Sequence, residues 1–286
     1  MHLGDVELIV VSAGSWWQDA GAHFGIVPRV LWEPVIALDD RHRVPMALNC
    51  LLIRSQDKTI LVDTGLGTKL SNKEQDKFGL QPSPGLLDNL AQLGVAPEDV
   101  DIVINTHLHV DHCGGNTVFD SGGQPTPTFP RAEYWIQRLE WADARYPNER
   151  TSKTYLPENL LPLEESGQLR LLYGDTPATD EVRCVITRGH TRAHQSVIIR
   201  SCGKSALYLG DLAPWRENIE KLAWGPAVDV DPLDTMETKR AIRQWVLEEH
   251  ALLLFEHDPR ISAGFLRRQG DEFHVEPVDP QSQEDW

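Results

Sequence analysis

The chain has 286 residues, 41% of them hydrophobic and 24% charged, and a formal net charge of −16 at pH 7. A chain of this length can bury a full core, and we expect a single domain over residues 1–286. The negative charge would repel a phosphate backbone, which argues against nucleic acid as a partner, and no apolar run is long enough to span a membrane.

The N-terminus and the cysteines both predict a cytoplasmic protein. Val6, Leu8 and Val10 are spaced two residues apart, which indicates a first strand, and no basic region precedes them as in a secretion signal. The cysteines form no CxxC pair, which favours buried thiols over disulfides or a thiolate zinc site. The four cysteines are Cys50, Cys113, Cys184 and Cys202.

Short β-rich runs bounded by turn residues recur along both halves of the chain. They lie at residues 48–54, 59–63, 101–105, 182–187, 196–200, 206–209 and 252–255. Helical periodicity appears in residues 85–93, 133–144 and 235–249. Strands and helices therefore interleave in each half, which predicts a layered α/β fold.

Two segments lack a regular period and are predicted to be loop or cap segments near the active site. Residues 14–45 place large aromatics among glycines and prolines, and residues 121–168 begin with a stretch rich in Gly, Pro and Thr. Long loops in compact domains are more often functional than idle. We therefore hypothesise that Phe24 and Trp32 line a substrate pocket and contact the acyl chain of a substrate.

Four potential metal ligands lie within six residues directly after an apolar strand. They form the pattern HxHxDH with His107, His109, Asp111 and His112. Alternation along an extended segment places His107 and His109 on one side, and the following turn directs Asp111 and His112 toward a second point nearby. The pattern predicts a metal site rather than a solvated strand end.

Three further ligand types have the same position relative to a strand. His190, Asp211 and His257 each follow the end of an apolar run. One such residue alone would more often be structural, but together with the HxHxDH residues they supply enough ligands for two divalent ions. Mixed His and Asp ligation suits zinc, and cobalt, iron or manganese also fit such sites.

Two other residues are expected to support the ligands. His194 lies four residues after His190, where the ligand set is already complete, so we predict a supporting role. Asp63 follows the run at 59–62 and is expected either to orient a ligand histidine or to stabilise a turn.

The HxHxDH pattern, followed by a later His, Asp and His, resembles the metallo-β-lactamase superfamily over nearly the whole chain. The resemblance implies a four-layer αβ/βα sandwich in which helices flank two mixed β-sheets, with the site at one edge between the sheets. It also implies the role of each ligand: His107, His109 and His190 for the first metal, Asp111, His112 and His257 for the second, and Asp211 as the bridge.

Within that superfamily the sequence is most similar to bacterial quorum-quenching lactonases that open N-acyl-homoserine lactones. Residues 21–32 and 189–196 both match them, and a bridging aspartate is unlike the true β-lactamases. No basic surface for glutathione or RNA is found, which separates the chain from two other branches. One departure is Pro214, which occupies the place of a substrate-orienting tyrosine three residues after Asp211, with Trp215 next.

The resemblance implies an enzyme whose substrate is a small ester or lactone. We hypothesise that a hydroxide bridging two metal ions attacks the lactone carbonyl and that Asp111 passes the proton to the leaving alkoxide. A phosphotriesterase or arylesterase on the same dinuclear site is the alternative. A metal-stabilised binding domain without catalysis is a third reading, and a homodimer is an open alternative to a monomer.

Overall fold

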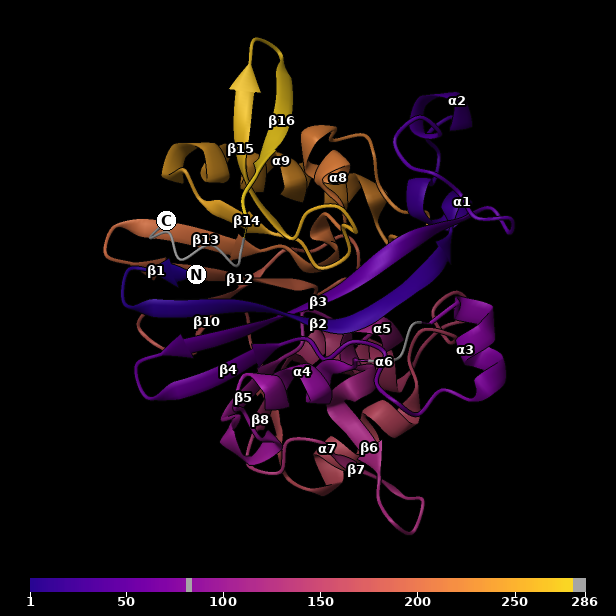
Figure 1. Cartoon of the computed structure of the whole chain (residues 1–286), viewed down its shortest axis with the longest axis vertical. Helices are drawn as coiled ribbons and strands as arrows, with labels where there is room; N and C mark the ends of the chain where they lie inside the picture. The colour runs from indigo at the N-terminus through magenta and orange to yellow at the C-terminus, as the bar shows by residue number, and fades with distance from the viewer. Residues whose placement is uncertain (81–83, 280–286) are drawn as a thin grey trace.

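A computed structural model of the protein describes residues 1–80 and 84–279. Two seven-stranded sheets lie face to face, and a two-stranded hairpin stands apart from them. Helices cover the outer side of each sheet, so the layers run helices, sheet, sheet, helices (Figure 1). This arrangement confirms the predicted αβ/βα sandwich with two mixed sheets.

The first sheet comes from the N-terminal part of the chain and has the order β1-β2-β3-β4-β5-β8-β9. Its strands are β1 His2–Leu3, β2 Val6–Asp19, β3 Arg43–Ser55, β4 Lys58–Val62, β5 Ile102–Ile104, β8 Glu133–Gln137 and β9 Leu169–Leu172. The pairs from β1 to β4 are antiparallel, and those from β4 to β9 are parallel. Its accompanying elements are α3 Asn72–Phe78, α4 Leu86–Gln92, α5 Val110–Cys113, α6 Arg138–Arg145, α7 Leu161–Glu165 and the hairpin β6 Thr117–Phe119 with β7 Pro125–Pro127.

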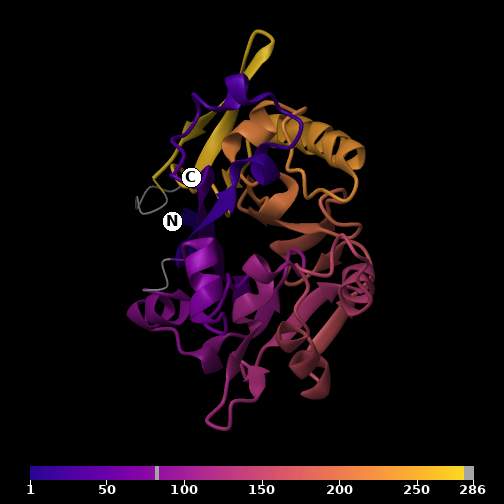
Figure 2. The ribbon, with the colours of Figure 1, turned by 90° about the vertical axis from the view of Figure 1, so that its right-hand side faces the viewer.

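The second sheet follows in the chain with the order β10-β11-β12-β13-β14-β15-β16. Its strands are β10 Thr176–Pro177, β11 Val182–Ile186, β12 Gln195–Ser201, β13 Lys204–Tyr208, β14 Leu252–Leu254, β15 Ala263–Gln269 and β16 Glu272–Pro277. Only the pair β13 and β14 is parallel among these strands. The helices α8 Arg216–Glu220 and α9 Pro232–Glu249 pack on its outer side, as Figure 2 also shows for α9.

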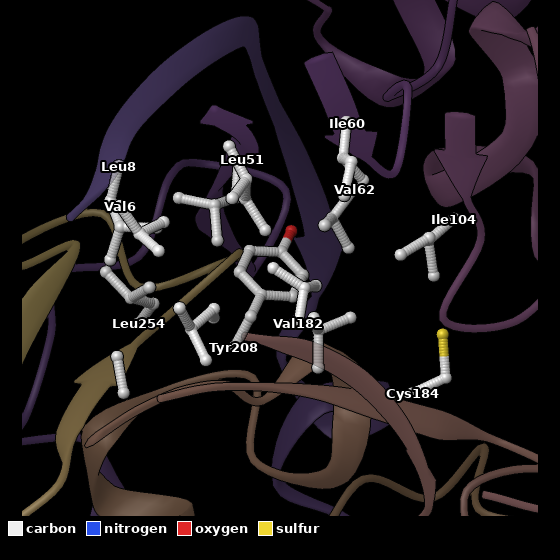
Figure 3. Packing of buried hydrophobic residues seen from close by; sticks show 14 of the residues in the cluster. Val6, Leu8, Leu51, Ile60, Val62, Ile104, Val182, Cys184, Tyr208 and Leu254 are labelled. Atoms are coloured by element: carbon white, nitrogen blue, oxygen red, sulfur yellow. The ribbon is translucent and has the colours of Figure 1, made fainter. Parts of the chain in front are cut away.

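The main core lies between the two sheets. Leu51 and Ile104 of the first sheet and Val182 and Leu254 of the second belong to one buried cluster, seen from close by in Figure 3. Alternate residues of the same strands face outward, where they pack against helices such as α4 and α9. Burial of apolar surface on both faces of each sheet therefore holds the four layers together.

The sheet topology brings several strand ends to one edge of the sandwich. Strands β4 and β5 run parallel in the first sheet, and β13 and β14 run parallel in the second. A backbone hydrogen bond of 2.9 Å from Gln195 to Thr106 joins the two sheets at this edge. Residues that follow β5, β11, β13 and β14 are thereby gathered in one place.

Both segments predicted to be loops contain regular structure, which corrects that expectation. Strand β2 continues to Asp19 through a bulge between Ser12 and Ser15, and α1 Ala20–Phe24 and α2 Arg29–Trp32 follow it. The bulge breaks the alternation that would have shown the strand. Residues 121–168 include β8, where the sequence predicts the start of a helix. The prediction is wrong because a parallel strand buried on both faces has no alternating pattern.

The cysteines are free thiols, as predicted, and three of them are buried. Among the helices of the described residues, none combines the length and the apolar character that a membrane span requires.

Candidate metal centre

The structure brings all seven predicted ligands together at the edge between the sheets. They form two neighbouring groups, and within each group the potential ligand atoms lie within 4.8 Å of one another. The first group is His107, His109, His190 and Asp211, and the second is Asp111, His112 and His257. The histidines and Asp111 fall into the two sets that the sequence resemblance implied, and Asp211, implied as the bridge, is grouped here with the first set.

Short local structures aim these side chains. The helix α5 begins directly after His109 and places Asp111 and His112 in its single turn. His190 and Asp211 each follow a glycine with a positive φ, +131° at Gly189 and +54° at Gly210. A Cβ atom at Gly189 would lie 2.3 Å from a backbone nitrogen, so only glycine permits this approach before the ligand.

Asp211 lies between the two groups. Its Oδ2 atom is 3.2 Å from Nε2 of His190 and 3.5 Å from Nε2 of His112, and its Oδ1 atom is 3.2 Å from Nε2 of His257. Oδ2 therefore faces one ligand of each group, and Oδ1 faces a ligand of the second group. This geometry is what a carboxylate shared by two ions requires.

The donor set fits divalent ions. Nδ1 of His109 and Nε2 of His190 are 3.1 Å apart, and Nε2 of His112 and Nε2 of His257 are 3.0 Å apart. Two ligand nitrogens at about 2.0–2.1 Å from a tetrahedral zinc ion would be separated by roughly 3.3 Å. Nε2 of His107 and Oδ1 of Asp211 are buried and have no hydrogen-bond partner among the described residues. A cation between the groups would satisfy both atoms.

Outer polar groups hold the first group in place. Nδ1 of His190 lies 2.9 Å from Oδ1 of Asp229, which leaves Nε2 facing the site. The buried carboxylate of Glu140 accepts hydrogen bonds from the backbone of Leu108 at 2.9 Å and from the hydroxyl of Thr191 at 2.6 Å. Glu140 thus ties the HxH segment to the residue that follows His190.

The second group has carboxylates behind its histidines. Nδ1 of His112 contacts Oδ2 of Asp63 at 3.2 Å, in hydrogen-bond geometry, and Oε2 of Glu256 at 2.8 Å, as an ion contact. Nδ1 of His257 donates to the carbonyl oxygen of Ala47 at 2.7 Å. Both histidines therefore direct Nε2 toward the site.

The two residues expected to support the ligands do so. Nε2 of His194 accepts a hydrogen bond of 3.0 Å from the backbone of Asp211. Asp63 orients His112 and also accepts bonds from the backbone and hydroxyl of Thr106 at 2.8 and 2.7 Å. Of the two roles that the sequence left open, the contacts of Asp63 support the orientation of His112, and its bonds to Thr106 join the segments that follow β4 and β5.

The pKa shifts differ among the histidines of the site. Burial and neighbouring histidines hold the pKa values of His107 and His109 well below the ordinary value. Burial also opposes protonation of His257, but the carboxylate of Asp211 overrides it and raises the pKa of His257 to about 9. Burial alone would raise the pKa of Asp211, yet the surrounding histidines keep it well below the ordinary range. Asp211 is therefore an anion at neutral pH.

Three supporting carboxylates were missed by sequence reasoning. Glu256 directly precedes a predicted ligand, and its position after β14 is the one signal that could have found it. Asp229 and Glu140 lie in stretches without a motif. Each is buried, which for a carboxylate requires paired partners, but burial is not readable from these stretches.

Phe24 and Trp32 are packed in an aromatic cluster. Their rings stack 4.5 Å apart with an interplanar angle of 6°, and Phe24 also contacts Trp215 and Trp224 edge-on. Both side chains are buried. The structure gives them a packing role, and contact with a substrate chain stays a prediction.

Comparisons with known proteins place this arrangement among metal-dependent enzymes. A family model described as the metallo-beta-lactamase superfamily matches residues 43–257. An N-acyl homoserine lactonase of Bacillus cereus is 29% identical over 221 residues, which cover 73% of this chain and 80% of the relative.

Solved structures share the fold over almost the whole length. A probable metal-dependent hydrolase from Staphylococcus aureus is 26% identical with a TM-score of 0.89, covering 98% of this chain and 99% of the other. The dizinc quorum-quenching lactonase AidC is 21% identical with a TM-score of 0.79, covering 98% and 96%. At that identity the second likeness shows the fold alone.

Proposed function

The chain belongs to the metallo-beta-lactamase superfamily and is a metal-dependent hydrolase, and from this premise we propose that it opens N-acyl-homoserine lactones at a pair of divalent ions. The observation that carries the proposal is the position of Asp211, whose two carboxylate oxygens approach ligands of both groups at 3.2 Å. The lactonase relatives support the substrate class. Zinc is the metal that the donor set suits best, and cobalt, iron and manganese are the alternatives.

The chain's own residues supply position and charge for this chemistry. Divalent ions, when bound, provide a Lewis acid and lower the pKa of bound water to about 7. The backbone N–H of Asp211 donates a hydrogen bond to Nε2 of His194. The carboxylate of Asp211 faces both groups. The carboxylate of Asp111 remains partly exposed at the second group. We infer that its oxygen accepts the proton that the attacking water loses and delivers it to the leaving alkoxide.

A substrate panel on one metal-replete preparation tests the proposal. It contains acyl-homoserine lactones, simple γ- and δ-lactones, an aryl ester, a phosphotriester and nitrocefin. We expect the highest kcat/KM for a lactone and a far lower value for nitrocefin. His107→Ala should abolish turnover, and His274→Ala, which changes an exposed histidine on β16, is the matched control.

Two results would contradict the proposal. A phosphotriester or aryl ester turned over faster than every lactone would establish the alternative activity on the same centre. A nitrocefin rate equal to the best lactone would remove the lactonase assignment. A cytoplasmic location and a homodimer are predictions that this panel does not address.

A further inference from the structure

His23 is a buried polar side chain without a hydrogen-bond partner in the described residues. It lies in α1 and is 1% exposed, and neither of its ring nitrogens meets a donor or acceptor. Buried polar groups are almost always paired, because an unpaired one forfeits its bonds to water. Such a histidine points to a partner that the polypeptide does not supply.

The neighbours of His23 place it beside the metal centre. Its ring centroid is 4.0 Å from that of Trp215, which follows Asp211 by four residues, and 4.8 Å from that of Phe24. The indole nitrogen of Trp215 is also buried without a partner. The charges of Asp211 and His257 both act on the His23 ring. The buried cluster that contains Phe24 and Trp215 packs against Val110, which lies between His109 and Asp111 in the chain. The unpaired nitrogens of His23 and Trp215 therefore belong to a cluster that adjoins the HxHxDH segment.

Its protonation state makes His23 a hydrogen-bond donor rather than an acid. Burial, more than the neighbouring charges, lowers the pKa of His23 to about 3. The neutral ring carries one N–H donor and one acceptor nitrogen. It therefore offers a directed donor beside the metal centre without adding positive charge there.

We propose that His23 donates a hydrogen bond to the amide carbonyl oxygen of an N-acyl-homoserine lactone while the lactone ring lies at the metal ligands. The inference rests on the proposed function and names the group that distinguishes these substrates from simple lactones. The amide is joined directly to the lactone ring, so a side chain packed next to the ligands is in reach of it. Trp215 and Phe24 bound the imidazole on two sides and fix its plane.

The test compares an acyl-homoserine lactone with a γ-lactone of similar length that lacks the amide. Metal-replete wild type, His23→Leu and His23→Gln are measured on both substrates. His23→Leu should lower the ratio of the two kcat/KM values about tenfold, as expected for one lost hydrogen bond, mainly through KM. His23→Gln keeps a donor and should recover part of the ratio.

A melting curve without substrate distinguishes this role from a structural one. His23→Leu removes unpaired buried nitrogens at similar volume, so its melting temperature should be at or above the wild-type value. A histidine needed for folding would lower it and reduce turnover of both lactones equally. His23→Met, a flexible apolar replacement, serves in the same way if the leucine variant does not fold.

Trp16→Phe is the matched control. The Trp16 indole nitrogen is likewise buried and unpaired, but its ring packs edge-on against Phe78 at 5.5 Å. Its substitution should leave the substrate ratio unchanged. An unchanged ratio in His23→Leu, with wild type active on the acyl-homoserine lactone, overturns the inference alone. Wild type that opens neither lactone overturns the proposed function and the inference together.

Discussion

The two halves of the metal centre differ in the carboxyl groups around their histidines. In the first half, which has three histidines, His190 contacts one outer carboxylate, Asp229. In the second half, Asp111 is a potential ligand, and His112 contacts two further carboxyl groups, Asp63 and Glu256. Similar ligand numbers are therefore combined with different electrostatic surroundings.

This difference determines where protons lie before an ion binds. His112 and His257 both have raised pKa values, although burial opposes this, because carboxylates surround them. In the first half only His190 has a raised pKa, while the values of His107 and His109 are lowered. The first half is mostly ready to bind an ion, and the second must first release protons.

Removing the carboxylate that the halves share should have the largest effect. Asp211→Asn keeps the shape but removes the charge that faces both groups. We expect kcat/KM to fall at least about a hundredfold and the metal content to drop below the two ions per chain proposed for wild type. Steady-state kinetics on the best lactone and elemental analysis of the same sample measure the two effects.

Asp57→Asn, which changes an aspartate with a side chain 85% exposed, controls for a general loss of negative charge. If Asp211→Asn keeps two ions and wild-type turnover, Asp211 is not the group that the two halves share.

The next largest effect is expected at low pH, where the two halves should differ in metal affinity. Ligand histidines bind metal only when deprotonated, so a raised pKa lowers affinity at every pH below it. The pKa of His257 is raised to about 9, and that of His112 is also raised. Metal affinity of the second half should therefore rise with pH up to that range, and dialysis at about pH 6 should release its ion first.

Metal content measured across a pH series tests this order, with His274→Ala again as the control. Simultaneous release of both ions at every pH would show that the halves titrate as one unit.

A smaller effect is expected from the outer carboxylates. Among the ligands, Asp229→Asn disturbs His190 in the first half, and Glu256→Gln disturbs His112 and, through its charge, His257 in the second. Outer partners of metal ligands typically change metal affinity about 10–100-fold. We expect Asp229→Asn to lower the affinity for the first ion and Glu256→Gln to lower the affinity for the second. Competition with a chelator measures both affinities. Matching losses of both ions in either variant would contradict independent support.

The clustering of the proposed ligands could be predicted from sequence because each lies in the segment that follows a strand. His107 to His112 form one local pattern, and His190, Asp211 and His257 repeat its context. The supporting carboxylates lacked such a signal. Asp229 is 39 residues from the histidine it contacts, and Glu140 is 32 residues from Leu108. Only the folded chain brings these pairs together.

The fold shows the same division between local and tertiary information. Strands β11 to β14 were predicted because β-rich runs there end at clear turns. For strand β8 the sequence predicts part of a helix instead, because tertiary burial on both faces removes the alternation. The packing of Phe24 on Trp32 was missed because aromatic composition does not distinguish a pocket wall from a core.

The smallest expected effect concerns Glu140, one layer behind the first half. Its Oε1 atom accepts bonds from Leu108 at 2.9 Å and from Tyr155 at 3.1 Å, and its Oε2 atom accepts one from Thr191 at 2.6 Å. Glu140→Gln retains one oxygen and places an amide donor opposite the Thr191 hydroxyl, which can turn to accept it. We expect the free energy of unfolding to fall by about 1–2 kcal/mol in a denaturant titration.

Metal affinity decides whether Glu140 belongs to the first half. It reaches the ligands through Leu108, Thr191 and Tyr155, whose ring lies 5.3 Å from that of His109. Because each of these paths is indirect, Glu140→Gln should weaken binding of the first ion by less than about tenfold, below the range for direct partners. The second ion should be unaffected, because no bond of Glu140 leads to its ligands. Tyr155→Phe removes one of the three donors to Glu140 and keeps Leu108 and Thr191. It should lower the affinity for the first ion less than Glu140→Gln does. Equal weakening of both ions by Glu140→Gln would mean that the halves share this support and differ only in the carboxyl groups at His112.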